Sequence, residues 1–207
     1  SDLAFRASDN GGALAMCFMQ YRDSKCRINN VTFIENTAEI GGAIYADQYV
    51  FYGEQMETLR FSGTSLEHSI IHMTSAFFLK NSAANGGALQ LNNVPAVFED
   101  VKMADNTAQQ NGGSLLLKGL SVMHLNRGQF RGNNATSGGA IFISERSMMR
   151  CLKCNVTFNQ ATREGGGIAV SFLSGDTLPY AFQCDGCLIE GNQARLGGKA
   201  YCLFVKF

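Results

Sequence analysis

The sequence contains no tryptophan, only two prolines and only three histidines among its 207 residues. It also lacks an excess of either charge, since 17 basic side chains balance 17 acidic ones. A chain without a basic stripe lacks the electrostatic footprint of a nucleic-acid-binding protein, so we expect no nucleic-acid partner. No apolar run is long enough to span a bilayer. No stretch with a 3.6-residue period is long enough to predict a main-chain helix.

What the sequence does contain is an internal repeat that covers nearly the whole chain. Each unit has an Asn, an Ala two residues later, and a Gly-Gly pair five or six residues after the Asn, as in Asn36, Ala38 and Gly41-Gly42. The shortest interval between pairs is about 26 residues, and the longer intervals indicate insertions. The repeated asparagines are Asn36, Asn81, Asn106, Asn133, Asn159 and Asn192.

Two short strands are predicted in each unit. After every Gly-Gly pair, the second and fourth residues are apolar, as in Leu115 and Leu117, which is typical of a strand with one buried face. The residue three positions before each Asn is also apolar, which predicts a strand that ends near the Asn. That column contains Phe33, Phe78, Met103, Phe130, Val156 and Ile189.

A unit of this size cannot bury its own apolar face, but stacked units can. We therefore predict an all-β fold, a right-handed single-stranded parallel β-helix of about seven rungs. Residues 1–207 would form one segment of a longer protein, with an insertion at about 47–74. The asparagines should stack in a side-chain ladder at a turn, where Asn tolerates left-handed backbone angles. The Ala should fit a tight corner, and the Gly-Gly pair should supply backbone angles that side chains forbid.

The combination of F-x-x-N with G-G-A-[ILV] resembles the repeats of the chlamydial polymorphic outer-membrane proteins. It is clearest at Phe33 to Asn36 with Gly41 to Ile44, and it recurs around Asn81 and Asn133. Similar repeats occur in large eukaryotic cell-surface proteins with pectin-lyase-like folds. The resemblance implies a surface rod used in adhesion or display. Because its motif residues are structural, it implies no catalytic residue.

Four of the seven cysteines occupy equivalent positions in adjacent repeats. Cys154 and Cys187 lie five residues before the ladder Asn, and Cys151 and Cys184 lie eight residues before it. Stacked columns bring such residues to a distance suited to disulfides. We therefore predict bonds from rung to rung, Cys154 with Cys187 and Cys151 with Cys184. Local bonds within each C-x-x-C, or a zinc site, are the alternatives, and no metal is expected.

The other cysteines are harder to assign. Cys17 and Cys26 could close a loop between the first two rungs, and Cys202 is left as a free core thiol or a partner for another segment. An oxidising compartment would suit this cysteine content. Three N-x-[ST] sequons begin at Asn30, Asn134 and Asn155, and they are glycosylation candidates in a eukaryotic host.

No cluster of catalytic residues is evident. The acidic residues are scattered over different positions of the repeat, whereas β-helix lyases and hydrolases need carboxylates gathered on neighbouring rungs. His68 and His72 are four residues apart but lie outside any metalloprotease pattern. The insertion carries several aromatic side chains and is either a contact surface or a cover for one flank.

These observations favour a non-enzymatic extracellular or cell-surface module without a cofactor, which works as a rigid spacer or an adhesion and assembly scaffold. The expected partners are other protein chains or the rest of its own polypeptide, with cell-surface glycans or receptors as further candidates. The alternative is a pectin-lyase-like carbohydrate-active enzyme or a glycan-binding module.

Overall fold

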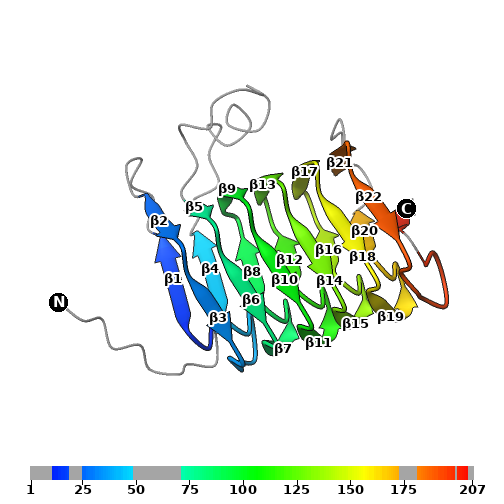
Figure 1. The fold of residues 1–207 in the computed structure, drawn as a ribbon, viewed down its shortest axis with the longest axis horizontal. Coiled ribbons are helices and arrows are strands. Elements are labelled where there is room, and N and C mark those ends of the chain that lie inside the picture. The colour runs from blue at the N-terminus through cyan, green and yellow to red at the C-terminus, as the bar shows by residue number, and fades with distance from the viewer. Residues whose placement is uncertain (1–10, 19–24, 49–70, 173–180, 199, 205–207) are drawn as a thin grey trace.

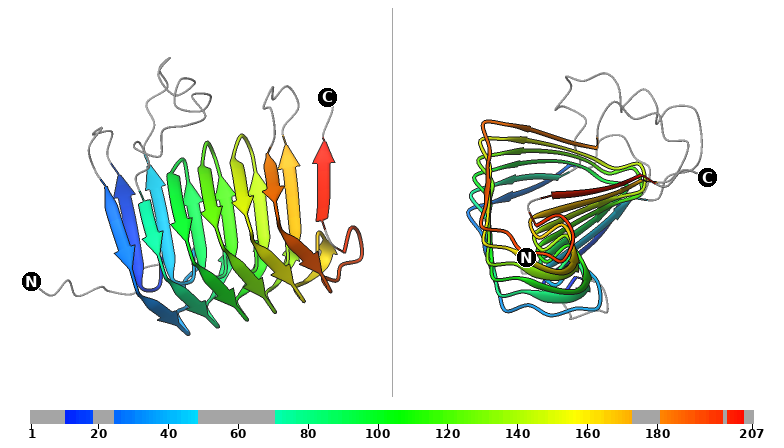
Figure 2. Two further views of the ribbon diagram at one scale, coloured as in Figure 1. Left: turned by 45° about the horizontal axis from the view of Figure 1, so that its top comes forward. Right: turned by 90° about the vertical axis from the view of Figure 1, so that its right-hand side faces the viewer.

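The structure, a computed structural model, describes residues 11–18, 25–48, 71–172, 181–198 and 200–204. In these residues the chain coils into an all-β parallel solenoid of about five turns (Figure 1). Viewed end on, the strands of successive turns lie one behind another (Figure 2). No helix in this described part is long and apolar enough to cross a membrane.

Each turn visits four parallel sheets in the same order. Sheet 1 follows the Gly-Gly pairs and contains β1 (Leu14–Phe18), β4 (Ile44–Gln48), β8 (Leu89–Asn92), β12 (Leu115–Lys118), β16 (Ile141–Ser144), β20 (Ile168–Phe172) and β23 (Ala200–Phe204). Sheet 2 contains β2 (Cys26–Asn29), β5 (Ile71–Thr74), β9 (Pro95–Glu99), β13 (Val122–Asn126), β17 (Met148–Leu152) and β21 (Phe182–Asp185). Sheet 3 contains β3 (Thr32–Ile34), β6 (Phe77–Leu79), β10 (Lys102–Ala104), β14 (Gln129–Arg131), β18 (Asn155–Thr157) and β22 (Leu188–Glu190). Sheet 4 contains β7 (Ser82–Asn85), β11 (Thr107–Asn111), β15 (Asn134–Ser137) and β19 (Gln160–Glu164).

The seven strands of sheet 1 correspond to the seven Gly-Gly pairs, but fewer turns close completely. Sheet 4 has only four strands, and at its two ends the chain is joined by isolated bridges such as Thr37 to Ser82 and Gln160 to Gln193. The segment between β4, which ends at Gln48, and β5, which begins at Ile71, falls within the insertion predicted at about 47–74. Residues 49–70 lie outside the described residues, so its proposed aromatic contact surface stays a prediction.

The core runs along the inside of the coil and is built from the predicted columns. The first and third residues of the sheet 1 strands are fully buried in the middle turns, for example Leu115 and Leu117. The apolar column of sheet 3 is in register from Phe33 to Ile189, and Phe33 stacks on Phe78 with ring centroids 4.8 Å apart. The alternation predicted from the sequence is therefore confirmed.

The six asparagines form the predicted ladder. At Asn106, Oδ1 accepts hydrogen bonds from the backbone N and the Nδ2 of Asn81, at 2.9 and 3.0 Å. Its Nδ2 donates to Asn133 Oδ1 at 3.0 Å and to the carbonyl of Phe78 at 3.1 Å. This side chain uses its full capacity of two donors and two acceptors. The same pattern continues through Asn159 to Asn192.

The expectation that the Asn itself takes the left-handed conformation is wrong. The residue before it does so instead, with φ of 54° at Glu35, 53° at Asp105 and 56° at Phe158. Gly132 and Gly191 fill the same position in two other turns. The left-handed residue turns the chain, which leaves the Asn free to point inward and bond to its neighbours.

The two glycines of each pair are needed for different reasons. The first has positive φ, for example 65° at Gly112, as predicted. The second has no positive φ, but a Cβ on Gly113 would overlap the carbonyl oxygen of Gly139 in the next turn. The second glycine is therefore required by the close approach of stacked backbones, which the sequence interpretation missed.

Candidate functional site: a hollow on the outer face of sheet 3

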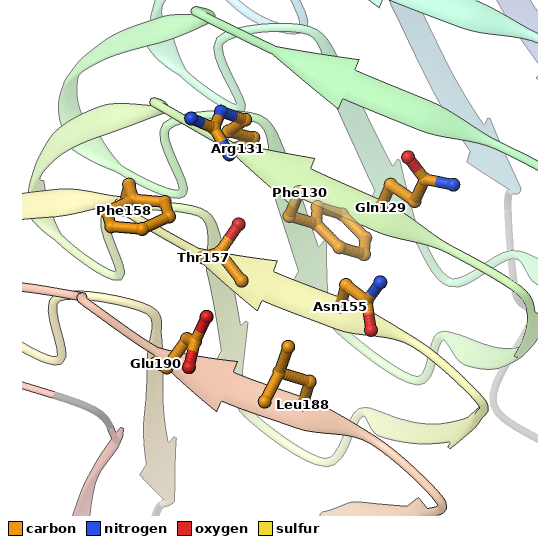
Figure 3. A pocket seen from close by; sticks show the side chains of 8 residues that line it. All are labelled: Gln129, Phe130, Arg131, Asn155, Thr157, Phe158, Leu188 and Glu190. Atoms are coloured by element: carbon orange, nitrogen blue, oxygen red, sulfur yellow. The ribbon is translucent and has the colours of Figure 1, made fainter.

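A shallow hollow of about 240 Å³ lies on the outer face of sheet 3. Three neighbouring strands, β14, β18 and β22, present their outward side chains there in register (Figure 3). Because side chains alternate along a strand, each strand contributes two positions to this face. The lining residues are Gln129, Phe130, Arg131, Asn155, Thr157, Phe158, Leu188 and Glu190.

The hollow has an apolar rim. Phe158 and Leu188 are 52% and 46% exposed, although large apolar side chains are usually buried. The guanidinium carbon of Arg131 lies 4.8 Å from the centre of the Phe158 ring, a cation–π contact. On the other side, the ring lies so close to Gly191 that a Cβ there would be only 2.7 Å from it. Phe158 is thus held between two turns, with its edge open to solvent.

The polar part of the hollow combines two amides with two opposite charges. Gln129 and Asn155 offer exposed amides, and Arg131 and Glu190 carry opposite charges. Glu190 is the one carboxylate among the lining residues, so the hollow itself holds no pair of carboxylates. Amides, a guanidinium and an apolar edge together can bind a polar ligand or a protein loop.

Two carboxylates lie together outside the hollow, and one arginine bridges them. Arg127 contacts Glu99 at 2.5 Å and Asp100 at 2.6 Å, on the corner between sheets 2 and 3. The hydrogen bond from Arg127 lowers the pKa of the Asp100 carboxyl. Both carboxylates are thereby tied to one cation and lie on an exposed corner, which does not suit a general acid or base.

A second hydrogen-bonded acid lies on the outer face of sheet 1. The Tyr45 hydroxyl donates to Asp47 Oδ2 at 2.9 Å. Burial, and then the interaction with Asp47, raise the pKa of Tyr45 to about 12. The phenol therefore keeps its proton near neutral pH, and the pair serves as a structural contact.

The histidines do not come together as a metal site. His72 lies on β5 and His124 on β13, with Val97 between them in the column, and His68 lies outside the described residues. Among the described residues, no group of three or more His, Cys, Asp or Glu side chains could hold a metal ion. Burial, and then the nearby Arg150, lower the pKa of His124.

The predicted rung-to-rung disulfides are not the bonds observed. Cys184 is bonded to Cys187, while Cys151 and Cys154 are free and fully buried. The predicted columns do exist, because Cys151 pairs with Cys184 in register. The left-handed Gly186, with φ of 62°, folds the second C-x-x-C back on itself and brings its two Cα atoms to 6.0 Å. The first C-x-x-C has the same turn, with φ of 53° at Lys153, so the turn allows a local bond but does not by itself explain why Cys151 and Cys154 stay free.

The predicted link between Cys17 and Cys26 is also absent. Both are free thiols, and they face opposite sides of the wall of the coil. Cys17 is exposed on sheet 1, whereas Cys26 packs against the core from sheet 2, where burial raises its pKa. Cys202 belongs to β23 and pairs in register with Val170, but its side chain is not among those that the structure describes.

The three sequons lie in different settings. Asn30 is exposed at a left-handed corner with φ of 53°, and Asn134 is half-buried at the start of β15. Asn155 is exposed on β18 and, together with Thr157, lines the hollow. Asn30 and Asn155 are thus accessible, and glycosylation of the three sequons stays a prediction.

Sequence reasoning did not find the hollow. The signal was a phenylalanine displaced from its core column to the position next to Asn159, where the left-handed backbone of Phe158 directs its ring outward. Arg131 and Glu190 carried no signal, because exposed charged residues are common at outward strand positions.

One family comparison agrees with this geometry. Residues 30–47 match the Chlamydia polymorphic membrane protein repeat. No curated protein and no solved structure is significantly similar to the chain. The matched stretch includes the ladder residue Asn36, the left-handed Glu35 and the pair Gly41-Gly42, so it coincides with one complete corner of the coil. The chain is therefore a parallel β-solenoid in which residues 30–47 are similar to the Chlamydia polymorphic membrane protein repeat.

Proposed function

We propose that this chain is a non-enzymatic, extracellular or cell-surface module that acts as a rigid scaffold for adhesion or assembly. The observation that carries the proposal is the asparagine ladder. Four of its six members are at most 1% exposed, and they link successive turns by side-chain and backbone bonds. The repeated residues are thus used inside the coil, which leaves contact with partners to the variable residues outside it.

Rigidity follows from the same bonds. A solenoid bends or breaks by separating adjacent turns, and each ladder residue joins two turns within a water-excluded corner. We infer a right-handed coil, because strand–crossover–strand connections are right-handed in about 98% of cases. The unit proposed is a rod of seven rungs, one for each Gly-Gly pair.

The hollow on sheet 3 is the contact surface that we propose for a partner. Its exposed apolar rim beside Arg131 and two amides suits a protein loop or a cell-surface glycan. A glycan-binding module is the second candidate, because Gln129 and Asn155 supply paired amides next to the exposed edge of Phe158. A carbohydrate-active enzyme is less well supported, since Glu190 is the single carboxylate lining the hollow.

The proposal is tested by binding of the purified chain to cell surfaces and to a glycan array. Arg131→Gln should weaken binding at least about tenfold, roughly 1.4 kcal/mol, because it removes the charge on the rim. Arg163→Gln is the matched control, since Arg163 is an exposed arginine on sheet 4. Equal loss with both variants, or binding unchanged by either, would contradict the hollow as the contact. Release of new reducing ends from pectin would contradict the non-enzymatic function.

A further inference from the structure

The two C-x-x-C segments are stacked as a buried dithiol beside a disulfide. Cys151 and Cys154 are free thiols on one turn, and the bonded Cys184 and Cys187 lie on the next. Cys151 and Cys184 are direct partners in the pairing of β17 with β21. The backbone N of Leu188, the residue after Cys187, donates to the carbonyl of Cys154 at 2.9 Å, so the two turns are also hydrogen-bonded beside Cys154 and Cys187.

One sulfur also contacts the backbone of the neighbouring turn. Cys187 Sγ lies 3.8 Å from the carbonyl oxygen of Cys151 on the neighbouring turn. Adjacent parallel strands lie about 4.8 Å apart, which falls within the Cα separations that disulfides span. Each thiol of one turn therefore has a disulfide sulfur of the next turn within reach, without unfolding of either strand.

From this stacking we propose that the four cysteines form an intramolecular thiol–disulfide exchange site, through which the bond of the outer C-x-x-C passes to the buried one. Cys154 is the attacking residue. Its Sγ accepts a hydrogen bond from the backbone N of Gly128 at 3.3 Å, a contact that stabilises a thiolate. The hydrogen bond with Cys151 also lowers the pKa of Cys154 and raises that of Cys151.

The exchange balances without any added reagent. The Cys154 thiolate attacks Cys187 Sγ, the bond between the two turns forms, and the Cys184–Cys187 bond breaks. Cys184 leaves as a thiolate and takes up a proton. Cys151 then loses its proton and attacks Cys154 Sγ, which forms the Cys151–Cys154 bond and releases Cys187 as a thiolate. One disulfide and two thiols are present before and after.

The exposure of the four cysteines determines which of the two pairs a dissolved reagent can reach. Cys151 and Cys154 are fully buried, so a dissolved oxidant or reductant cannot reach them in the folded coil. Cys184 and Cys187 are only partly buried. A soluble disulfide such as oxidised glutathione would therefore react at the outer pair, and the buried pair would exchange electrons only through it.

The decisive experiment uses Cys151→Ser/Cys184→Ser, which leaves Cys187 without its local partner and removes the thiol that would resolve the bond between the two turns. With oxidised glutathione, Cys187 should first form a mixed disulfide with glutathione, and Cys154 should then displace the glutathione. Trypsin releases residues 154–163 and 164–195 as separate peptides, because cleavage sites at Lys153, Arg163 and Arg195 flank them. The two peptides should be recovered cross-linked under non-reducing conditions. In the matched triple variant Cys151→Ser/Cys154→Ser/Cys184→Ser, the cross-link should be lost and the glutathione adduct at Cys187 should remain.

Recovery of Cys187 as the glutathione adduct in both variants would overturn the proposal. If Cys151→Ser/Cys184→Ser does not fold, the wild-type chain decides. It is reduced, oxidised with one equivalent of oxidised glutathione, freed of glutathione and alkylated after increasing times. The alkylating label should move from peptide 151–153 to peptide 164–195 at a rate independent of protein concentration. Label that stays on Cys151 and Cys154 at all times would contradict exchange.

Discussion

Two neighbouring columns at one corner of the coil follow opposite rules. The ladder column is Asn in all six turns, and its side chains bond from turn to turn. The column one residue earlier contains Glu, Lys, Asp, Gly, Phe and Gly, although every member has positive φ. Backbone conformation alone therefore does not demand one residue type. Buried hydrogen bonding does, because an unpaired amide inside the corner is costly.

The largest difference between the two columns should appear at Asn106 and Asp105. Asn106→Ala should lower the unfolding free energy by about 3–5 kcal/mol, because it orphans bonding groups on Asn81, Asn133 and Phe78. Asp105→Gly should change it by less than about 1 kcal/mol, because glycine accepts the left-handed conformation. Urea unfolding of both variants checks this. Similar urea midpoints for the two variants would contradict the proposed difference between the two columns.

The next largest effect contrasts two glycines. Gly113→Ala should cost about 3 kcal/mol, because the new Cβ would overlap the carbonyl of Gly139 in the next turn. Gly132→Ala should cost about 1–2 kcal/mol, because the alanine takes the left-handed region and its Cβ displaces only the exposed Asp105 carboxylate, whose Oδ1 would lie 2.4 Å away. Thermal unfolding of both variants measures the order. A larger loss at Gly132 would show that backbone angle matters more than turn spacing.

A smaller effect is expected on the strand that follows the ladder. Ala108 is 3% exposed and faces inward on β11, whereas Gln110 is exposed on the same strand. Ala108→Leu overfills the corner and should cost about 1–3 kcal/mol, and Gln110→Leu should be near neutral. Equal denaturation midpoints would contradict the inward assignment of the alanine column.

The smallest expected effect is a dependence of stability on pH, and it arises at a residue away from the corner of the coil. The pKa of His124 is lowered in the folded chain, so the unfolded chain binds a proton more readily. Stability should therefore be complete above the ordinary histidine pKa of about 6.5 and should decrease as the pH falls below it. Unfolding curves between pH 7.5 and about 5.5 should show this slope. The slope should be shallower in His124→Asn, and an identical slope in that variant would assign it to other groups.

Most of the fold was predictable because its determinants repeat. The Asn, the Ala, the apolar columns and the first glycine each recur at fixed spacing, so one interpretation applies to every turn. The left-handed column was missed, because Glu35, Lys80 and Phe158 share a conformation but no chemistry. The disulfide was misassigned, because the left-handed turn inside each C-x-x-C, at Lys153 and at Gly186, allows the local bond that the column argument kept only as an alternative. The hollow depends on one displaced Phe158, and a single side chain has no repeat to reveal it.

The ladder can be tested most directly by hydrogen exchange of the asparagine side-chain amides, measured by NMR. The Nδ2 protons of Asn81, Asn106 and Asn133 are bonded on both sides in a corner closed to water. They should exchange at least about a thousandfold more slowly than those of the exposed Asn155, an opening free energy of roughly 4 kcal/mol. Exchange of the ladder amides at the rate of Asn155 would contradict the ladder as the element that joins the turns.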